Sequence, residues 1–200
     1  VRSPAEKVMK SLLILGAGGF GHMIQETAKL LGYEKAVFLD DAVRDPDVVG
    51  KCCDYESFLG QYDTAVAALG DNNMRLHCTE KLMEAGYDVP AIIHPSAVVS
   101  PSASVGKGSF IMQRAIVNTH TVVEHGVLIN SGAVVDHDSY VERGAHIGLG
   151  SVVKANCRIA SKVKVEAGEV IFSTRRKIDG VEDRNLEDAI YAFGFGNRCS

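Results

Sequence analysis

The chain has 200 residues, 46% of them hydrophobic and 23% charged, with a formal net charge of −4. This composition can bury a core but offers no broad basic surface for nucleic acid and no apolar stretch of the length that spans a bilayer. Residues 1–10 show no secretory-type apolar run, so a cytoplasmic location is expected, and the odd set of five cysteines without a C-x-x-C pair indicates neither a disulfide framework nor a zinc knuckle.

The first half alternates strand and helix signals. An apolar run at 11–15 leads into a glycine turn and a helical pattern that ends near Leu31. Further strands are expected at 35–39 and 64–68, and a second helix at 72–84. This order predicts an α/β, Rossmann-like N-terminal domain over residues 1–91, with a sheet of about three strands.

The glycine turn has the features of a nucleotide site. Gly16, Gly18 and Gly21 fit G-x-G-x-x-G, with Gly19 inside it, and Asp40 follows at the fingerprint's usual separation. Glycines let the backbone approach a phosphate, and the helix start attracts negative charge. Because the sheet is short, one nucleotide is favoured over a dinucleotide. Alternatively the glycines serve only helix packing, and Asp40 and Asp41 are solvated loop acids.

A six-residue repeat fills the second half. From Ile93 to Ile171 every sixth residue is aliphatic, fourteen times without a miss, and the residue four positions later is usually small. A helical period of 3.6 would drift out of this register. The repeat therefore predicts short strands joined by tight corners and stacked as a parallel β-helix.

The pattern [LIV]-x-x-x-[small]-x resembles the hexapeptide-repeat acyltransferases. Together with LGAGGFGH at 15–22, LGDNNMR at 69–75 and INSGAVVDHDSYVERGAHIGLG at 129–150, the chain is similar to sugar N-acetyltransferases of the PglD type and to NeuD-type sialic-acid O-acetyltransferases. The resemblance implies a left-handed parallel β-helix, with three hexads per coil, over residues 92–172. Residues 173–200 are then a C-terminal tail with a short helix.

His137 and Asp138 form the sharpest chemical signal. Transfer of an acetyl group needs a base to take a proton from the attacking group, and an imidazole held by a carboxylate suits that task. The resemblance gives His137 the role of base and Asp138 the position of an acid that is commonly Glu in the family. Asp136 is a second candidate for orienting the ring, and an ordinary solvated histidine is the alternative.

Further site residues follow from the resemblance alone. It makes Asn130 a substrate contact, His146 a contact to the acyl-CoA arm, and the backbone N–H of Ala155, one coil beyond His137, a donor to the thioester oxygen. At the third strand's end, Gly70, Asp71, Asn72 and Arg75 would face the sugar and pyrophosphate. Alternatively, Asn130 is a corner residue and His146 a surface histidine. Asp71 and Asn72 would then be a helix cap, with Arg75 as a surface arginine.

The expected function is a homotrimeric acetyltransferase with active sites at subunit interfaces. It would use acetyl-CoA as co-substrate, without a metal, to acetylate the amine of a UDP-linked 4-amino-4,6-dideoxy sugar by direct attack. Three alternatives stay open: a sialic-acid-type O-acetyltransferase, a non-catalytic nucleotide-sugar binder, and a metalloenzyme like the gamma-type carbonic anhydrases, in which His120 and His125 would bind zinc.

The end of the chain departs from the family pattern. After Ile171 the usual last coil is absent, and the basic run Arg175, Arg176 and Lys177 could meet the phosphates of CoA or form a solvated turn.

Overall fold

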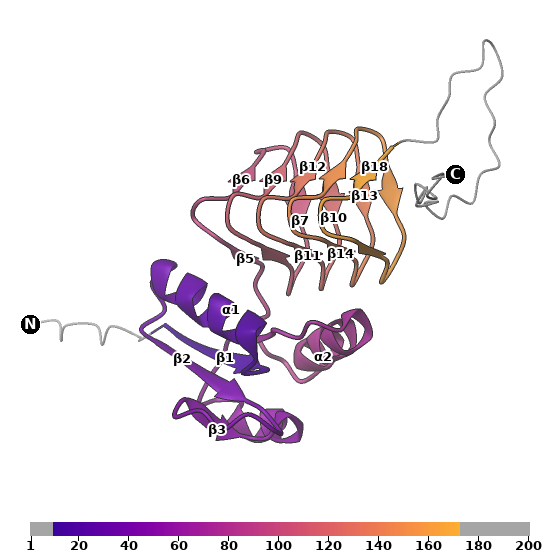
Figure 1. Cartoon of the computed structure of the whole chain (residues 1–200). Helices are drawn as coiled ribbons and strands as arrows, with labels where there is room; N and C mark the ends of the chain where they lie inside the picture. The colour runs from indigo at the N-terminus through magenta and orange to yellow at the C-terminus, as the bar shows by residue number, and fades with distance from the viewer. Residues whose placement is uncertain (1–9, 173–200) are drawn as a thin grey trace, which may run out of the picture.

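The structure is a computed structural model that describes residues 10–172. An α/β domain comes first and a parallel β-helix follows it (Figure 1). The short helix expected in the tail, and the run of Arg175, Arg176 and Lys177, lie outside the described residues.

The front domain contains the elements that the sequence predicts. They are β1 (Ser11–Leu15), α1 (Gly19–Leu30), β2 (Lys35–Leu39), β4 (Ala65–Ala67) and α2 (Asn72–Glu84). β1 pairs in parallel with β2 on one side and β4 on the other. Its alternate residues serve two cores: Leu12 and Ile14 pack toward α1, whereas Leu13 and Leu15 pack toward Tyr62 and Leu82, the latter in α2. Both faces are buried, which explains the continuous apolar run.

The expectation of about three strands is wrong by one. A short strand β3 (Val48–Gly50) joins the edge, giving the order β3-β2-β1-β4, and the 3-10 helix η1 (Cys52–Phe58) follows it. β3 is only three residues long, none of them buried, and its register with β2 shifts between Phe38 and Leu39. Such an edge strand has no periodic pattern of apolar residues for sequence reasoning to detect. Within residues 10–172, no helix has the length and apolar character needed to cross a membrane.

The β-helix consists of two-residue strands, each ending on an aliphatic residue of the repeat. Each of these side chains faces the interior, and from Ile111 to Ile171 they are 4% exposed or less. The strands are β5 (Ile92–Ile93), β6 (Val98–Val99), β7 (Ser104–Val105), β8 (Phe110–Ile111), β9 (Ile116–Val117), β10 (Val122–Val123), β11 (Leu128–Ile129), β12 (Val134–Val135), β13 (Tyr140–Val141), β14 (His146–Ile147), β15 (Val152–Val153), β16 (Arg158–Ile159), β17 (Lys164–Val165) and β18 (Val170–Ile171).

Pairing of every third strand makes three parallel sheets. We call them the covered sheet (β5, β8, β11, β14, β17), the apolar sheet (β6, β9, β12, β15, β18) and the polar sheet (β7, β10, β13, β16). Paired residues are 18 positions apart, as in Val134 opposite Val152. One coil therefore holds three hexads, as the resemblance implies.

The corners explain which residues stand between the strands. From residue 108 to 168 the third residue after each inward aliphatic has a positive φ, whether glycine or not. The non-glycine residues there include His120 and Asp138, with φ of 57° and 55°. Asn, Asp and His tolerate this left-handed conformation better than most residues. The fold thus admits polar side chains at regular steps along one corner.

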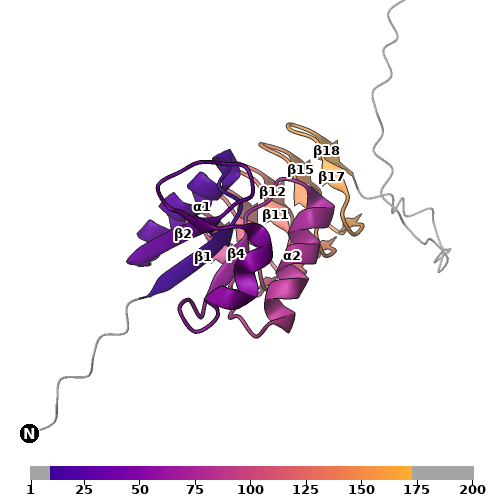
Figure 2. The same ribbon diagram turned by 90° about the horizontal axis from the view of Figure 1, so that it is seen from below.

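The front domain packs on the covered sheet. Outward residues Ile92, Phe110 and Leu128 join the core beneath α1, and Phe20 contacts Phe110 edge to face with ring centroids 5.1 Å apart. Figures 1 and 2 show the α/β domain along one side of the β-helix. The apolar and polar sheets face away from this contact.

Arg75 of α2 fastens the two domains together. It is fully buried. Its Nε donates to Gly126 O at 3.0 Å and its Nη2 donates to Gly144 O at 2.9 Å, both at corners of the β-helix. It also donates to Leu69 O and to the side chain of Asn72. Burial lowers the pKa of its guanidinium to about 10, so Arg75 is charged and bonded mainly to carbonyl oxygens.

Replacing Arg75 by Met should leave these carbonyl groups buried without donors. We expect Arg75→Met to lower the free energy of unfolding by about 2–4 kcal/mol. Lys81→Met on the exposed face of α2 is the matched control and should change it by less than about 0.5 kcal/mol. Denaturant melts of the two variants test this. Equal stability of Arg75→Met and the unmodified protein would show that the bonds across the domain contact contribute little.

Candidate active site

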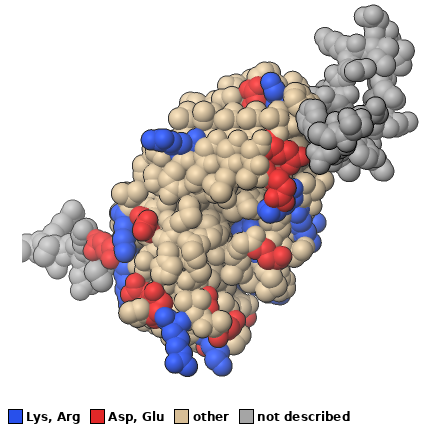
Figure 3. All heavy atoms as spheres, viewed as in Figure 1, with Lys and Arg blue, Asp and Glu red and all other residues tan. Residues whose placement is uncertain are grey.

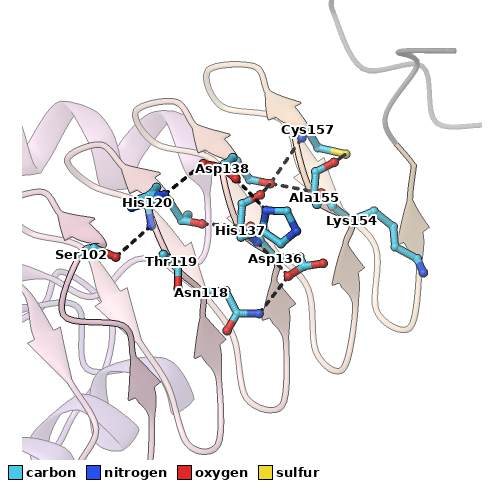
Figure 4. Close-up of polar contacts among 12 residues, drawn as sticks. Ser102, Asn118, Thr119, His120, Asp136, His137, Asp138, Lys154, Ala155 and Cys157 are labelled. Carbon is cyan, nitrogen blue, oxygen red and sulfur yellow. Dashed lines mark hydrogen bonds and ion pairs between the residues drawn. The ribbon is translucent and has the colours of Figure 1, made fainter. Parts of the chain in front are cut away.

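The His137 and Asp138 pair lies on the corner between the apolar and polar sheets (Figure 4). His137 Nδ1 is 2.7 Å from Asp138 Oδ2. An ionised carboxylate only accepts hydrogen bonds, so Nδ1 carries the proton and Nε2 is the nitrogen left to accept one. This hydrogen bond raises the pKa of His137 and lowers that of Asp138. The imidazole is half exposed, so its Nε2 is open to a ligand.

Asp138, rather than Asp136, orients the ring. Asp136 Oδ1 accepts from the backbone N–H of His137 at 2.8 Å and from Asn118 Nδ2 at 3.0 Å. These two donors lower the pKa of Asp136. Its carboxylate therefore fixes the corner's backbone, and the side chain of Asp138 is long enough to reach the imidazole although the family commonly has Glu at this position.

Ala155 lies one coil beyond His137. The backbone N–H of Asn156 donates to His137 O at 3.1 Å, which holds the two coils in register. Across residues 10–172, the N–H of Ala155 has no protein acceptor. It is an available donor one coil from His137, and its role toward the thioester oxygen stays a prediction.

Asn130 and His146 form a second group. His146 Nε2 lies 3.3 Å from Asn130 Nδ2, and the N–H of Ser131 donates to Asn130 Oδ1 at 2.8 Å. The latter bond makes Nδ2 the free end of the amide and hence a donor to His146 Nε2. Burial, with the nearby charge of Arg75, lowers the pKa of His146 to about 4. His146 is thus a neutral imidazole with its proton on Nδ1.

Within one chain, the His137–Asp138 pair and the Asn130–His146 pair lie on different sides of the β-helix. His146 points outward from the covered sheet, on the side of the front domain, and Asn130 begins the adjacent corner. His137 lies on the corner between the other two sheets. In a three-sided coil that corner faces away from the covered sheet.

The glycine turn has two kinds of glycine. Gly16 has a φ of 100°, and a Cβ on Gly21 would collide with Gly16 O, so the backbone conformation and the packing of the turn need these two glycines. A Cβ on Gly18 or Gly19 would meet no atom within 4 Å. α1 begins there with no side-chain cap and no acid in its first turn. The turn keeps open space and free N–H groups at a helix start, which suits a phosphate.

The acids near the turn are bound to backbone amides. Asp40 accepts from Ala17 N at 2.8 Å and from two amides of its own loop. Burial alone would raise the pKa of Asp40, but these hydrogen bonds lower it. Asp41 accepts from Cys52 N at 3.2 Å. Asp40 therefore braces the glycine turn, and its role toward a ribose stays a prediction.

The residues after β4 that were predicted to face the sugar and pyrophosphate lie in different surroundings. Gly70 has open space around it. Asp71 caps α2 by accepting from Met74 N at 2.8 Å, and Asn72 Nδ2 donates to Lys162 O at 2.8 Å. The prediction that Arg75 contacts the substrate is wrong, because its guanidinium is fully buried and its N–H groups donate to protein oxygens. It is not a surface residue either.

The contact of His120 with Asp138 was not predicted from the sequence, which raised His120 only as a zinc ligand. His120 Nδ1 lies 3.3 Å from Asp138 Oδ1, whereas His125 lies on a different corner and pairs with Glu80. No cluster of three or more metal-binding side chains occurs in residues 10–172. The separation of 18 residues between His120 and Asp138, one coil, was the signal that could have revealed their contact.

A charged groove of about 610 Å³ lies elsewhere, between α2 and the corners joining the polar and covered sheets. Its acids support the coils: Glu124 accepts from Arg143 N at 2.8 Å and Glu142 from Ser161 N at 2.9 Å. None of the residues expected to bind the sugar or acetyl-CoA lines it, whereas His125, raised above as a zinc ligand, does.

Comparison with known proteins agrees with this architecture. Residues 11–82 match the family model of the PglD N-terminal domain. The chain is 32% identical over 117 residues to a UDP-N-acetylbacillosamine N-acetyltransferase of Bacillus subtilis, in a match that spans 52% of each protein, about half the length of that relative.

Two solved structures share the fold over most of both chains. PerB from Caulobacter crescentus, in complex with CoA and GDP-perosamine, is 28% identical with a TM-score of 0.73, covering 81% of this chain and 88% of PerB. The acetyltransferase domain of PglB from Neisseria gonorrhoeae is 31% identical with a TM-score of 0.66, covering 82% of this chain and 91% of that domain.

These findings confirm the predicted fold class, a Rossmann-like domain followed by a left-handed parallel β-helix. A Rossmann-like front domain joined to such a helix is the architecture that this chain shares with PerB and the PglB domain, and it defines the class of hexapeptide-repeat sugar acyltransferases. Within that class, the chain belongs to the PglD-type family of sugar acetyltransferases.

The two kinds of glycine can be separated by mutation. Gly21→Ala should lower the free energy of unfolding by about 1–3 kcal/mol, because its Cβ would collide with Gly16 O. Gly19→Ala should keep the stability and weaken UDP binding about tenfold, since the Cβ would enter the space where a phosphate approaches. Thermal melts and calorimetric titration measure the two effects. Wild-type affinity for UDP in Gly19→Ala would mean that the turn serves packing alone.

Proposed function

We propose that this protein transfers acetyl from acetyl-CoA to the amine of a UDP-linked 4-amino-4,6-dideoxy sugar. The observation that carries the proposal is the imidazole of His137, held through Nδ1 by Asp138 and open at Nε2. The family adds support, because the Bacillus subtilis relative is named as a UDP-N-acetylbacillosamine N-acetyltransferase and PerB was solved with CoA and GDP-perosamine.

The proposed step is direct attack in a ternary complex. The amine nitrogen attacks the thioester carbonyl carbon while His137 Nε2 takes the proton that the amine loses. The backbone N–H of Ala155 donates to the oxyanion of the tetrahedral intermediate. The carbon–sulfur bond then breaks, and the thiolate of CoA takes the proton from His137. The products are the N-acetylated sugar and free CoA, with no acyl-enzyme and no metal in the step.

The site is completed by a second copy of the chain in a homotrimer. His137 faces away from the front domain and from His146 of its own chain. We infer that the corner of one subunit lies against Asn130, His146 and the front domain of the next. Acetyl-CoA then binds between subunits.

The apolar sheet supplies a surface for this contact. Its five outward residues are all aliphatic, whereas the outward residues of the polar sheet include Ser104, Tyr140 and Arg158. Val98 and Val170 are 60% and 41% exposed in the single chain. In the view of Figure 3 the middle of the β-helix is mostly uncharged, and acidic and basic side chains gather along its right side. A stripe of β-branched side chains along the length of a β-helix is suited to packing on another copy. The outward residues are Val98, Ile116, Val134, Val152 and Val170.

The identity of the sugar that accepts the acetyl group is part of this proposal. The names of the relatives favour an amine over the hydroxyl of a sialic acid, and they include both UDP-linked and GDP-linked sugars. A panel of UDP- and GDP-amino-sugars, together with a sialic acid, separates these possibilities by substrate preference.

Activity of the purified trimer tests the function. With acetyl-CoA and the panel, the unmodified protein should release free thiol. His137→Ala should lower kcat by about 10²–10⁴-fold with the trimer intact by sedimentation. Because Asp138 raises the pKa of His137, the rate should increase with pH through a value above the usual one for histidine.

His77→Ala, at an exposed position of α2 outside the site, is the matched control and should retain full activity. Full activity in His137→Ala would exclude His137 as the base. Tight binding of nucleotide sugars without thiol release from any acceptor would instead identify the protein as a non-catalytic binder.

A further inference from the structure

The carboxylate of Asp138 is shared by two imidazoles. Oδ2 lies 2.7 Å from Nδ1 of His137, and Oδ1 lies 3.3 Å from Nδ1 of His120 (Figure 4). The two hydrogen bonds are among the causes that lower the pKa of Asp138, with that from His137 the larger. An ionised carboxylate has no proton to donate, so each Nδ1 carries one.

The β-helix fixes the position of His120 relative to Asp138. The two residues are 18 positions apart, occupy the same place in successive coils, and have nearly the same positive φ. Asp138 N donates to Thr119 O at 3.0 Å, and His120 N donates to Ser102 Oγ at 3.2 Å. His120 is therefore held beside the carboxylate by the backbone register and by the hydrogen bond from its backbone N–H to Ser102 Oγ.

We propose that His120 is a positioning residue for the His137–Asp138 pair. By binding Oδ1 it prevents rotation of the carboxylate, so that Oδ2 stays aligned with Nδ1 of His137 and Nε2 stays directed outward as the base. This inference rests on the proposed function. It assigns His120 a role at the acyl-transfer site in place of a zinc ligand.

Two substitutions at His120 separate positioning from structure. His120→Ala removes the donor to Oδ1. His120→Asn keeps an N–H donor close to the place of Nδ1 and suits a positive φ. We expect His120→Ala to lower kcat about tenfold with KM for both substrates unchanged, and His120→Asn to restore most of the loss.

Arg114 provides a matched control. It has the same φ of 57° at the equivalent place of another corner, and its N–H donates to Ser96 Oγ at 3.2 Å, just as that of His120 donates to Ser102. Arg114→Ala should therefore cost the same stability as His120→Ala but leave kcat unchanged. Unchanged kcat in His120→Ala, or an equal loss in His120→Asn, would overturn the proposal.

A measurement without turnover keeps the inference separate from the function. Nitrogen NMR of the histidine side chains should show neutral His137 as the Nδ1–H tautomer in the unmodified protein and in His120→Asn, and as a mixture of the Nδ1–H and Nε2–H tautomers in His120→Ala. If no acceptor is acetylated but this pattern holds, the proposed function fails and positioning stands. If all three proteins give the same spectrum for His137, His120 does not position the pair.

Discussion

The 18-residue register between coils is the constraint on which the rest of the structure depends. Each strand donates its backbone hydrogen bonds to the strand one coil away, so residues 18 apart must lie side by side. This register stacks Asn118 beside Asp136 and His120 beside Asp138, and it places Ala155 next to His137. The site's polar contacts are therefore a consequence of backbone pairing and need no loop to arrange them. A site held on regular strands and corners is rigid before any ligand binds.

Regular features were predictable from the sequence because they repeat. The aliphatic hexad predicted the strands of the β-helix because it reflects burial at a fixed period. A continuous apolar run followed by a glycine turn predicted β1 and α1. The chemistry of His137 and Asp138 was also visible as adjacent residues. Single contacts between distant segments could not be predicted from local sequence patterns. In the sequence, Arg75 is a helix residue shortly after a cap. It is buried only because α2 packs on the corners at Gly126 and Gly144, whose carbonyl groups it binds. β3 was not predicted because an edge strand of three residues, none of them buried, has no pattern of buried apolar residues.

The same packing separates the two halves of the candidate site. The front domain covers one sheet through Phe110 and its neighbours, and Arg75 fixes it there, so its glycine turn cannot swing toward His137 of the same chain without breaking buried hydrogen bonds. The outward aliphatic residues of the apolar sheet then have a role outside the packing of their own chain. In the proposed homotrimer they form the surface on which another copy packs, so that its covered sheet and front domain meet the free corner and complete the site.

Mixed trimers test this shared-site account most directly. His137→Ala and His146→Ala subunits, each of low activity alone, are unfolded together and reassembled in equal amounts. If the two residues come from neighbouring subunits, random assembly leaves one interface in four with both native side chains, so roughly a quarter of the wild-type activity should return. If mixed trimers form but their activity does not exceed the average of the two parent variants, His137 and His146 do not meet across a subunit interface, and the account is contradicted.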